Sequence, residues 1–279
     1  MSNGVIIFAN NNQQIDYVKQ AVFCAQRVKD FMGVETCLIT ENKSYYDQNF
    51  SDRNLFDYVI GIDKQQHVHN KKFRDGLYSE KTLPWKNHAR ISAYDLSPFD
   101  KTLVIDSDFI VSNDILNNCF TSNHNFLISK KFTDLKSARQ LQTLDTINDK
   151  SIDMYWATVF YFTKNQSNKI LFDLINHIKD NYDFYRLKYK IVETKYRNDF
   201  AFSIAIHIMN GFQQSNWPAT IPSKLWTTFD KDILLDITNE KMTILLEHGS
   251  DYIASTIKNA NVHIMNKFSL NRIIDEQNV

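Results

Sequence analysis

The sequence TLVIDSDFIV at residues 102–111 places two acidic residues, Asp106 and Asp108, directly after an apolar run. A short run rich in β-branched residues is typical of a buried strand. Two carboxylates buried without partners would cost several kcal/mol, so we expect them to face a cation. Open α/β sheets bind ligands at the carboxyl ends of their strands. Because carboxylate oxygens suit Mg²⁺ or Mn²⁺, ions that bridge to a diphosphate, the pair predicts a metal site there.

The residues before this run alternate between strand and helix patterns. We expect a helix over Ile15–Met32, ended by Gly33, because apolar residues recur at helical spacing and glycine is common just after a helix. This alternation predicts an α/β fold with a mostly parallel sheet and right-handed crossovers. The strands expected in this half are Gly4–Ala9, Thr36–Thr40 and Tyr58–Ile62.

The rest of the chain gives weaker signals. Residues 63–82 are polar and predict a surface excursion, Pro84 predicts the start of a helix over Trp85–Tyr94, and residues 133–153 predict a mobile helix or lid. Further strands are expected at Phe126–Ser129, Ala157–Phe162, Thr243–Leu246 and Asn261–Met265, further helices at Lys169–Ile178 and Asp199–Met209, and a tail from Asn271.

Composition restricts the class of protein. The 279 residues are 43% hydrophobic and carry 32 Lys+Arg against 32 Asp+Glu, so no overall charge favours nucleic acid or an anionic membrane. Basic clusters at residues 71–74 and 186–190 are local exceptions. Three cysteines without a CxxC pair, and no apolar run near the ~20 residues of a membrane helix, predict a cytoplasmic protein. The bias toward Asn, Lys and Ile suggests a bacterial or viral origin.

The run Leu103–Val111, with its Asp-x-Asp after a βαβ start, resembles the GT-A-fold nucleotide-sugar glycosyltransferases of the glycogenin-like and lipopolysaccharide-galactosyltransferase-like group, glycosyltransferase family 8. The resemblance implies a Rossmann-like GT-A domain over residues 1–270, with a nucleotide-binding half at 1–115, an acceptor and donor-sugar half at 116–270, and a tail at 271–279. It also implies a hexosyl- or pentosyltransferase that uses Mn²⁺ or Mg²⁺ and a UDP-sugar, acts on a hydroxyl of a glycan or other acceptor, and retains the anomeric configuration.

Several residues match the nucleotide-binding residues of this family. Tyr17, four residues before an alanine, resembles the tyrosine that packs on the base, and Ala9 and Asn10 would line the same pocket through their backbones. Lys86 resembles the lysine aimed at the sugar nucleotide, with Arg90 one turn later on the same helix face. The alternatives are a helix-surface tyrosine and an exposed basic face.

Residues near the end of the chain match the metal-binding residues of this family. In Val262–Lys267, His263 resembles the histidine that completes the metal shell and Lys267 the lysine that contacts the diphosphate. By the same resemblance Asp108 binds the ion, and Asp106 binds the ion or the ribose. The alternative for His263 is a core histidine. The family's Asn-x-Gly and Asp-Gln elements are replaced here by Trp156-Ala157-Thr158 and Asn198-Asp199-Phe200, in the acceptor and donor-sugar half.

An oxocarbenium-like transition state would be helped by a carboxylate near the anomeric carbon. Asp199 is the candidate, with Asp153 behind it; alternatively Asp199 caps the helix that it begins. Three other functions stay open. They are a haloacid-dehalogenase-type phosphatase with Asp106 as nucleophile, a non-catalytic nucleotide-sugar-binding module, and the same transfer with a hydroxymethylated DNA base of a phage as acceptor. The balanced charge gives no support to a DNA partner.

Overall fold

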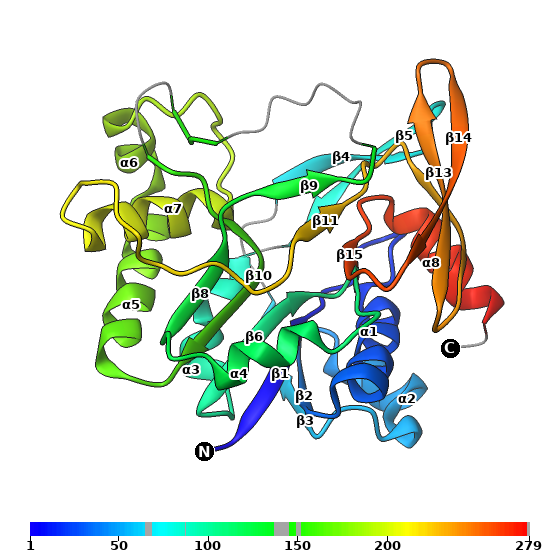
Figure 1. Ribbon diagram of the computed structural model, residues 1–279, viewed down its shortest axis with the longest axis horizontal. Coiled ribbons are helices and arrows are strands. Elements are labelled where there is room, and N and C mark those ends of the chain that lie inside the picture. Colours follow the sequence, from blue (N-terminus) through cyan, green and yellow to red (C-terminus); the bar gives the residue numbers. More distant parts are fainter. Residues whose placement is uncertain (65–68, 87, 137–144, 149–151, 278–279) are drawn as a thin grey trace.

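The computed structural model describes residues 1–64, 69–86, 88–136, 145–148 and 152–277. A six-stranded sheet lies at its centre (Figure 1). In spatial order the strands are β3 (Tyr58–Gly61), β2 (Glu35–Thr40), β1 (Asn3–Phe8), β6 (Lys101–Asp106), β10 (Trp156–Thr163) and β8 (Phe126–Ser129). Strands β3, β2, β1 and β6 pair in parallel, whereas β10 runs antiparallel to β6 and β8. The predicted α/β class with a mixed, mostly parallel sheet is confirmed.

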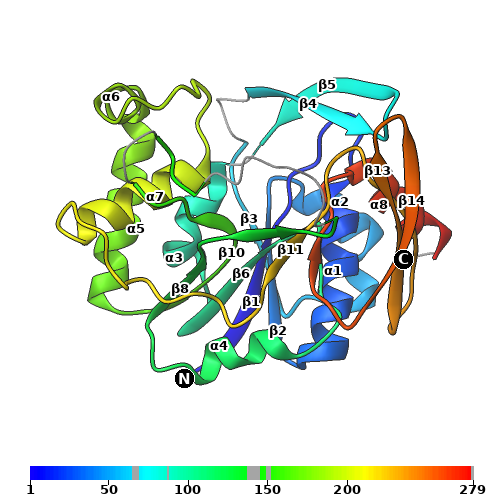
Figure 2. The same cartoon turned by 45° about the horizontal axis from the view of Figure 1, so that its top comes forward.

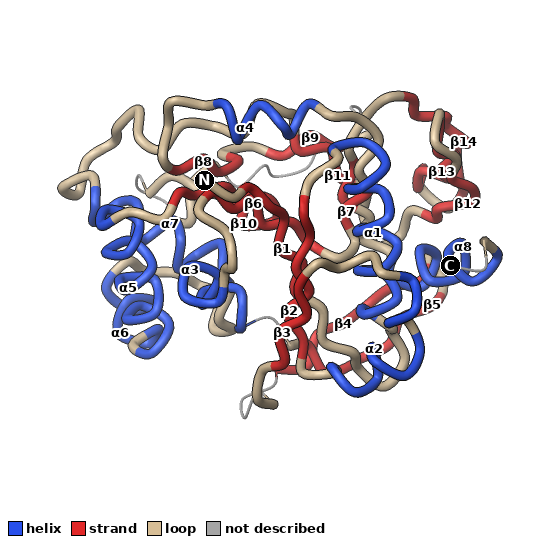
Figure 3. Tube along the Cα trace, turned by 90° about the horizontal axis from the view of Figure 1, so that it is seen from below, coloured by secondary structure: helices blue, strands red, loops and turns tan. Residues whose placement is uncertain are grey.

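Helices cover both faces of this sheet (Figure 3). Strand β1 shows why its sequence is an unbroken apolar run, since Ile6 packs into one core while Val5 and Ile7 pack into the other. The first core also receives side chains from α3 (Ala93–Leu96), α5 (Gln166–Asp180), α6 (Tyr182–Lys188) and α7 (Asn198–Met209). The second receives them from α1 (Tyr17–Met32), α2 (Lys43–Asn49) and α4 (Asn118–Thr121).

Helix α1 is fixed at both ends by local signals. The Asp16 side chain accepts a hydrogen bond from the backbone N–H of Lys19, which satisfies one of the free donors of the first turn. Gly33 adopts φ 64° and donates its N–H to the carbonyls of Val28 and Lys29. The predicted helix end at Gly33 is therefore confirmed, and the carboxyl end of β1 leads into the amino end of α1.

Two further sheets follow the turn at residues 107–108. The first contains β7 (Phe109–Ile110), β15 (Val262–His263), β11 (Leu225–Thr227) and β9 (Phe132–Asp134), in that order. The second contains β12 (Ile233–Ile237), β13 (Lys241–His248) and β14 (Asp251–Lys258). Helix α8 (Lys267–Glu276) packs against this second sheet through Leu270 and Ile274. Since α8 extends through Glu276, the tail expected from Asn271 is instead helical.

Residues 69–85 form a β-hairpin rather than the polar excursion and helix that the sequence predicted. Strand β4 (His69–Asp75) pairs with β5 (Ser79–Trp85), and the hairpin lies at the top of the molecule, beside β13 and β14 (Figure 2). Pro84 is accommodated within β5 because the hairpin is an isolated two-stranded sheet that leaves an outer edge free. The helix expected over Trp85–Tyr94 forms only in its later part, as the 3₁₀ turn His88–Ser92 followed by α3, and its predicted start at Trp85 was wrong because that residue ends β5.

The segment 133–153, expected to be a mobile helix or lid, lies largely outside the described residues. Its described parts comprise the end of β9 and a bridge between Thr146 and Asp153. Among the residues that the structure describes, no helix combines the length and apolar character needed to cross a membrane.

Candidate functional site

The carboxyl ends of three parallel strands meet at one edge of the central sheet. Phe8 of β1 pairs in register with Asp106 of β6, and Ala9 donates its N–H to the carbonyl of Ile39 in β2. The Asn10 side chain then accepts a hydrogen bond of 2.8 Å from the backbone N–H of Glu41. This is the edge where open α/β sheets place their ligands.

A short strand pairing brings His263 to the Asp106–Asp108 turn. His263 in β15 pairs with Phe109 in β7, and the Ile264 N–H donates to the carbonyl of Asp108 at 2.9 Å. The imidazole Nε2 lies 3.3 Å from Oδ1 of Asp108 and 3.8 Å from Oδ2 of Asp106. The structure thus brings together the three residues that the sequence predicted as metal ligands.

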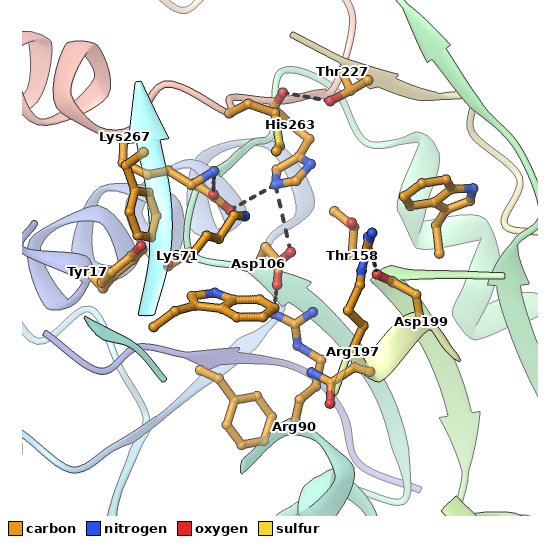
Figure 4. Close-up of a pocket in the computed structure, with 18 of the residues that line it drawn as sticks. Tyr17, Lys71, Arg90, Asp106, Thr158, Arg197, Asp199, Thr227, His263 and Lys267 are labelled. Carbon is orange, nitrogen blue, oxygen red and sulfur yellow. Dashed lines mark hydrogen bonds and ion pairs between the residues drawn. The ribbon is translucent and has the colours of Figure 1, made fainter. Parts of the chain in front are cut away.

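Two cations contact the carboxylates (Figure 4). Lys267 contacts Oδ2 of Asp108, and Arg90 contacts Oδ1 of Asp106. Burial acts to raise the pKa of the Asp108 carboxyl, but the charge of Lys267 and the hydrogen bonds from Lys267 and His263 outweigh it and hold the pKa well below its usual range. The pKa of His263 is lowered, chiefly by burial, so its imidazole is available in the neutral form that binds metals.

The donor set fits a divalent cation. One ligand atom from each of Asp106, Asp108 and His263 can be chosen so that all three lie within 4.8 Å of one another. Two carboxylate oxygens and one imidazole nitrogen suit Mn²⁺, and the carboxylates also suit Mg²⁺. Asp108 is 5% exposed, so such an ion would be bound away from bulk water on that side.

A cavity of about 570 Å³ opens beside this group. It is large enough for a drug-sized ligand. Most residues predicted for nucleotide or sugar binding line it: Asn10, Tyr17, Lys86, Arg90, Asp106, Asp108, Asp199, His263 and Lys267.

Two predicted residues lie elsewhere. Ala9 is 2% exposed and packs in the core below the cavity. Asp153 lines a separate and much smaller cavity and forms an ion pair of 2.8 Å with Lys130. The structure therefore separates Asp153 from Asp199.

The two cations that were expected on one helix face have different settings. Lys86 follows the last residue of β5, and its Nζ lies 2.7 Å from Oε2 of Glu41, a carboxylate that is almost fully buried. Arg90 lies in the 3₁₀ turn, donates to the carbonyl of Ala157 at 2.8 Å, and leaves its buried Nε without a hydrogen-bond partner among the described residues. Buried cationic donors of this kind are suited to an anionic or hydroxyl-rich ligand.

Asp199 is the second residue of α7, at the far side of the cavity. Its Oδ1 accepts a hydrogen bond of 2.9 Å from the Ala157 N–H, and its Oδ2 one of 2.8 Å from Arg197. The Arg197 guanidinium also lies over the ring of Trp156, 5.8 Å from its centroid. The carboxylate is thus anchored to the strand that borders the cavity. The alternative that Asp199 caps the helix is wrong, because the N-cap residue of α7 is Arg197.

Sequence reasoning assigned no site role to Lys71 and Trp85, which line the cavity from the β4–β5 hairpin. One signal could have found the hairpin. Asp75-Gly76 is a dipeptide favoured in hairpin turns, Gly76 has φ 78°, and the apolar residues Leu83 and Trp85 after it are two positions apart, as on one face of a strand. Nothing local in the sequence indicates that Lys71 faces the Asp106–Asp108 turn, because that contact depends on tertiary structure.

No family model matches the chain, and no curated protein sequence matches it. Among solved structures, the chain is similar to the glycosyltransferase GlyE of Streptococcus pneumoniae TIGR4, at 12% identity and a TM-score of 0.44, over 73% of this chain and 43% of that one. It is similar to the galactosyltransferase LgtC solved with donor and acceptor sugar analogues, at 14% identity and a TM-score of 0.43, over 72% and 70% of the two chains. It is also similar to mouse xyloside xylosyltransferase 1, at 9% identity and a TM-score of 0.43, over 74% and 82%.

All three of these proteins bear the name of glycosyltransferases, the class that the sequence resembles. The chain spans less than half the length of GlyE. At these identities and TM-scores the likeness concerns the arrangement of part of the elements, and function has to be argued from the cavity itself.

Proposed function

We propose that this protein is a metal-dependent glycosyltransferase, which transfers a hexose or pentose from a UDP-sugar to a hydroxyl group of a glycan or another acceptor. The observation that carries the proposal is the meeting of Asp106, Asp108 and His263 at the rim of a cavity whose other charged residues are mainly basic. Such a site suits a ligand that brings its own negative charge, as a nucleoside diphosphate does.

The chemistry requires stabilisation of the leaving group. When the bond between sugar and diphosphate breaks, negative charge grows on the diphosphate, and preorganised positive charge lowers the barrier. Asp106, Asp108 and His263 would hold a divalent ion, which would supply Lewis acidity to the phosphate oxygens. Lys267, 7% exposed and already in contact with Asp108, adds a fixed cation at the same position.

The remaining residues that line the cavity lie on two opposite sides of it, one for the nucleoside and one for the sugars. Asn10 and Tyr17, which follow β1 and begin α1, are placed to receive the nucleoside. Asp199 and Trp156 border the opposite side, where a donor sugar and an acceptor would meet. On this assignment Asp199 presents its carboxylate toward the anomeric carbon, and the Trp156 ring offers an apolar surface to a sugar face.

A binding panel tests this function. The protein is heated with UDP, GDP, CDP, ADP and their common sugar conjugates, each with Mn²⁺, with Mg²⁺ and with EDTA. A ligand at 100 times its dissociation constant should add about 2.7 kcal/mol to the free energy of unfolding, which corresponds to several degrees in Tm. We expect the largest shift for UDP or a UDP-sugar, only with metal present.

The best donor is then incubated with the enzyme to detect release of free sugar, since transfer to water stands in for the unknown acceptor. Asp108→Asn is the control, and it should abolish both the shift and the hydrolysis. If no nucleotide gives a metal-dependent shift, or if a phosphomonoester is hydrolysed in its place, the proposal is wrong.

A further inference from the structure

Lys71 is a cation that lines the cavity from the β4–β5 hairpin. It lies in β4 opposite Leu83 of β5, and its side chain lines the cavity. Its Nζ lies 5.0 Å from the ring centroid of Trp85 and 5.5 Å from that of Phe73. Among the residues that the structure describes, Lys71 has no ion pair and no hydrogen bond from its ammonium group. A partly buried ammonium held only between aromatic rings is costly unless a ligand supplies the counter-charge.

The hairpin that carries Lys71 is firmly attached to the molecule. Arg272 of α8 makes two hydrogen bonds to the Asp75 carboxylate, of 2.7 and 2.9 Å. The Leu77 N–H donates to the Tyr252 hydroxyl at 2.9 Å. Below the hairpin, Phe73 and Leu83 form a small apolar cluster with Ile15 in the loop before α1. Lys71 is therefore held in place over the cavity by contacts with three separate parts of the fold.

The charges around Lys71 indicate where an anionic ligand would contact it. Burial, followed by the charges of Lys267 and Arg197, lowers the pKa of Lys71 to about 8, while Asp108 and Asp230 act in the opposite direction. Lys71 and Lys267 enter the cavity on one side of Asp106, whereas Arg197 and Asp199 lie on the other (Figure 4). An anion that approached Asp106 and Asp108 with its metal would thus meet Lys71 and Lys267 together.

We infer that Lys71 binds the diphosphate of the donor, from the side of the hairpin, as a partner to Lys267 on the side of α8. This inference rests on the proposed function and deepens it, because it assigns a diphosphate contact to the β4–β5 hairpin. It also explains why the cavity carries a cation that Asp106 and Asp108 do not neutralise. The contact distinguishes a nucleoside diphosphate from a nucleoside, so Lys71 determines specificity for the charged part of the donor.

The test compares Lys71→Met and Lys71→Arg with the wild type, using UDP, UMP and uridine as probes in the presence of Mn²⁺. Methionine keeps the apolar stem between the two rings and removes the charge. Loss of a contact to a charged group should weaken UDP binding by about 10- to 100-fold. Binding of UMP should fall less, and binding of uridine should stay unchanged. Arginine should restore much of the UDP affinity.

Lys81→Met is the matched control. Lys81 belongs to the same hairpin and carries the same charge, but its Nζ bonds to the Gln14 side chain outside the cavity. This variant should bind UDP like the wild type. Tm measured without ligand excludes a folding defect, because Lys71→Met removes a desolvated charge and should not lower it.

Three results would overturn the inference. The first is that the wild type binds UDP and Lys71→Met binds it equally well. The second is that this variant loses affinity for uridine and for UDP in the same proportion. In either case Lys71 does not contact the diphosphate, while the proposed function stands. If neither UDP nor inorganic pyrophosphate binds the wild type with Mn²⁺, the proposed function and the inference fail together.

Discussion

His263 and Lys267 contact the two oxygens of one carboxylate, that of Asp108. The imidazole Nε2 lies 3.3 Å from Oδ1, and the lysine ammonium contacts Oδ2. A metal ion that binds Asp108 must share this carboxylate with both residues. Since Lys267 also donates to the carbonyl of Ile264 at 2.9 Å, it has a second partner to hold it when its contact with Asp108 weakens.

The metal site can be tested by removing its ligands one at a time. Asp106→Asn, Asp108→Asn and His263→Gln should each weaken Mn²⁺-dependent binding of UDP by at least about 100-fold, because changes even to groups behind metal ligands cost 10- to 100-fold. Isothermal titration with UDP, with and without Mn²⁺, measures the effect. Asp47→Asn on the exposed helix α2 provides a surface control. Wild-type affinity in Asp108→Asn would show that this carboxylate is not a ligand.

The pair of Asp108 and Lys267 should show strong coupling in protein without metal. Asp108→Asn alone leaves the Lys267 charge buried without its partner, so the free energy of unfolding should fall by about 3–5 kcal/mol. Adding Lys267→Met should recover part of this loss, with a coupling energy of about 0.5–3 kcal/mol. Urea unfolding in EDTA measures the free energy of unfolding of the wild type, the two single variants and the double variant. Additive effects would contradict the contact between the two side chains.

Lys71 should make UDP binding depend on pH. Its pKa in the free protein is about 8, and a bound diphosphate should raise it. Near pH 9, where Lys71 is mostly neutral in the free protein, binding should therefore take up most of one proton, whereas near pH 6.5 Lys71 is charged before and after binding and takes up none. Titration in two buffers of different ionisation enthalpy measures the uptake, and Lys71→Met should remove it. The same uptake in the variant would assign the proton to another group.

The two candidate catalytic carboxylates can be separated by kinetics. Asp199 borders the cavity, while Asp153 pairs with Lys130 at a different one, so the two should respond differently. Asp199→Asn should lower kcat for donor hydrolysis by at least about 100-fold with little change in UDP affinity, whereas Asp153→Asn should change kcat by less than about threefold. A large loss of kcat in Asp153→Asn would reverse this assignment.

The sequence allowed the central sheet to be predicted because its signals are local. Apolar runs marked β1, β2 and β6, and Gly33 marked the end of α1. The Asp-x-Asp turn followed from the same reasoning, since acids after a buried strand need a partner. By contrast, the hairpin was missed because its strands are polar on one side, and α8 was missed because its buried face combines apolar residues with Lys267 and Ser269.

The geometry of the site could not be predicted from local patterns. That Glu41 would pair with Lys86, and that Arg197 would hold Asp199, depends on segments that come together only in the folded chain. The separation of Asp153 from Asp199 has the same origin. Asp153 precedes β10 in the sequence and Asp199 bonds to its Ala157 in the fold, but the two carboxylates line different cavities. Sequence patterns identify which groups need partners, whereas tertiary packing decides which partners they find.

The pairing of β15 with β7 has a consequence for biosynthesis. Asp106 and Asp108 leave the ribosome long before His263 and Lys267 do, and the central sheet can assemble in the interval. A nascent chain therefore carries two exposed acids that lack the imidazole and ammonium of the finished pocket. On the proposed function, a nucleotide would find the finished site only after His263 and Lys267 have been translated, so it would stabilise the completed molecule rather than the early sheet.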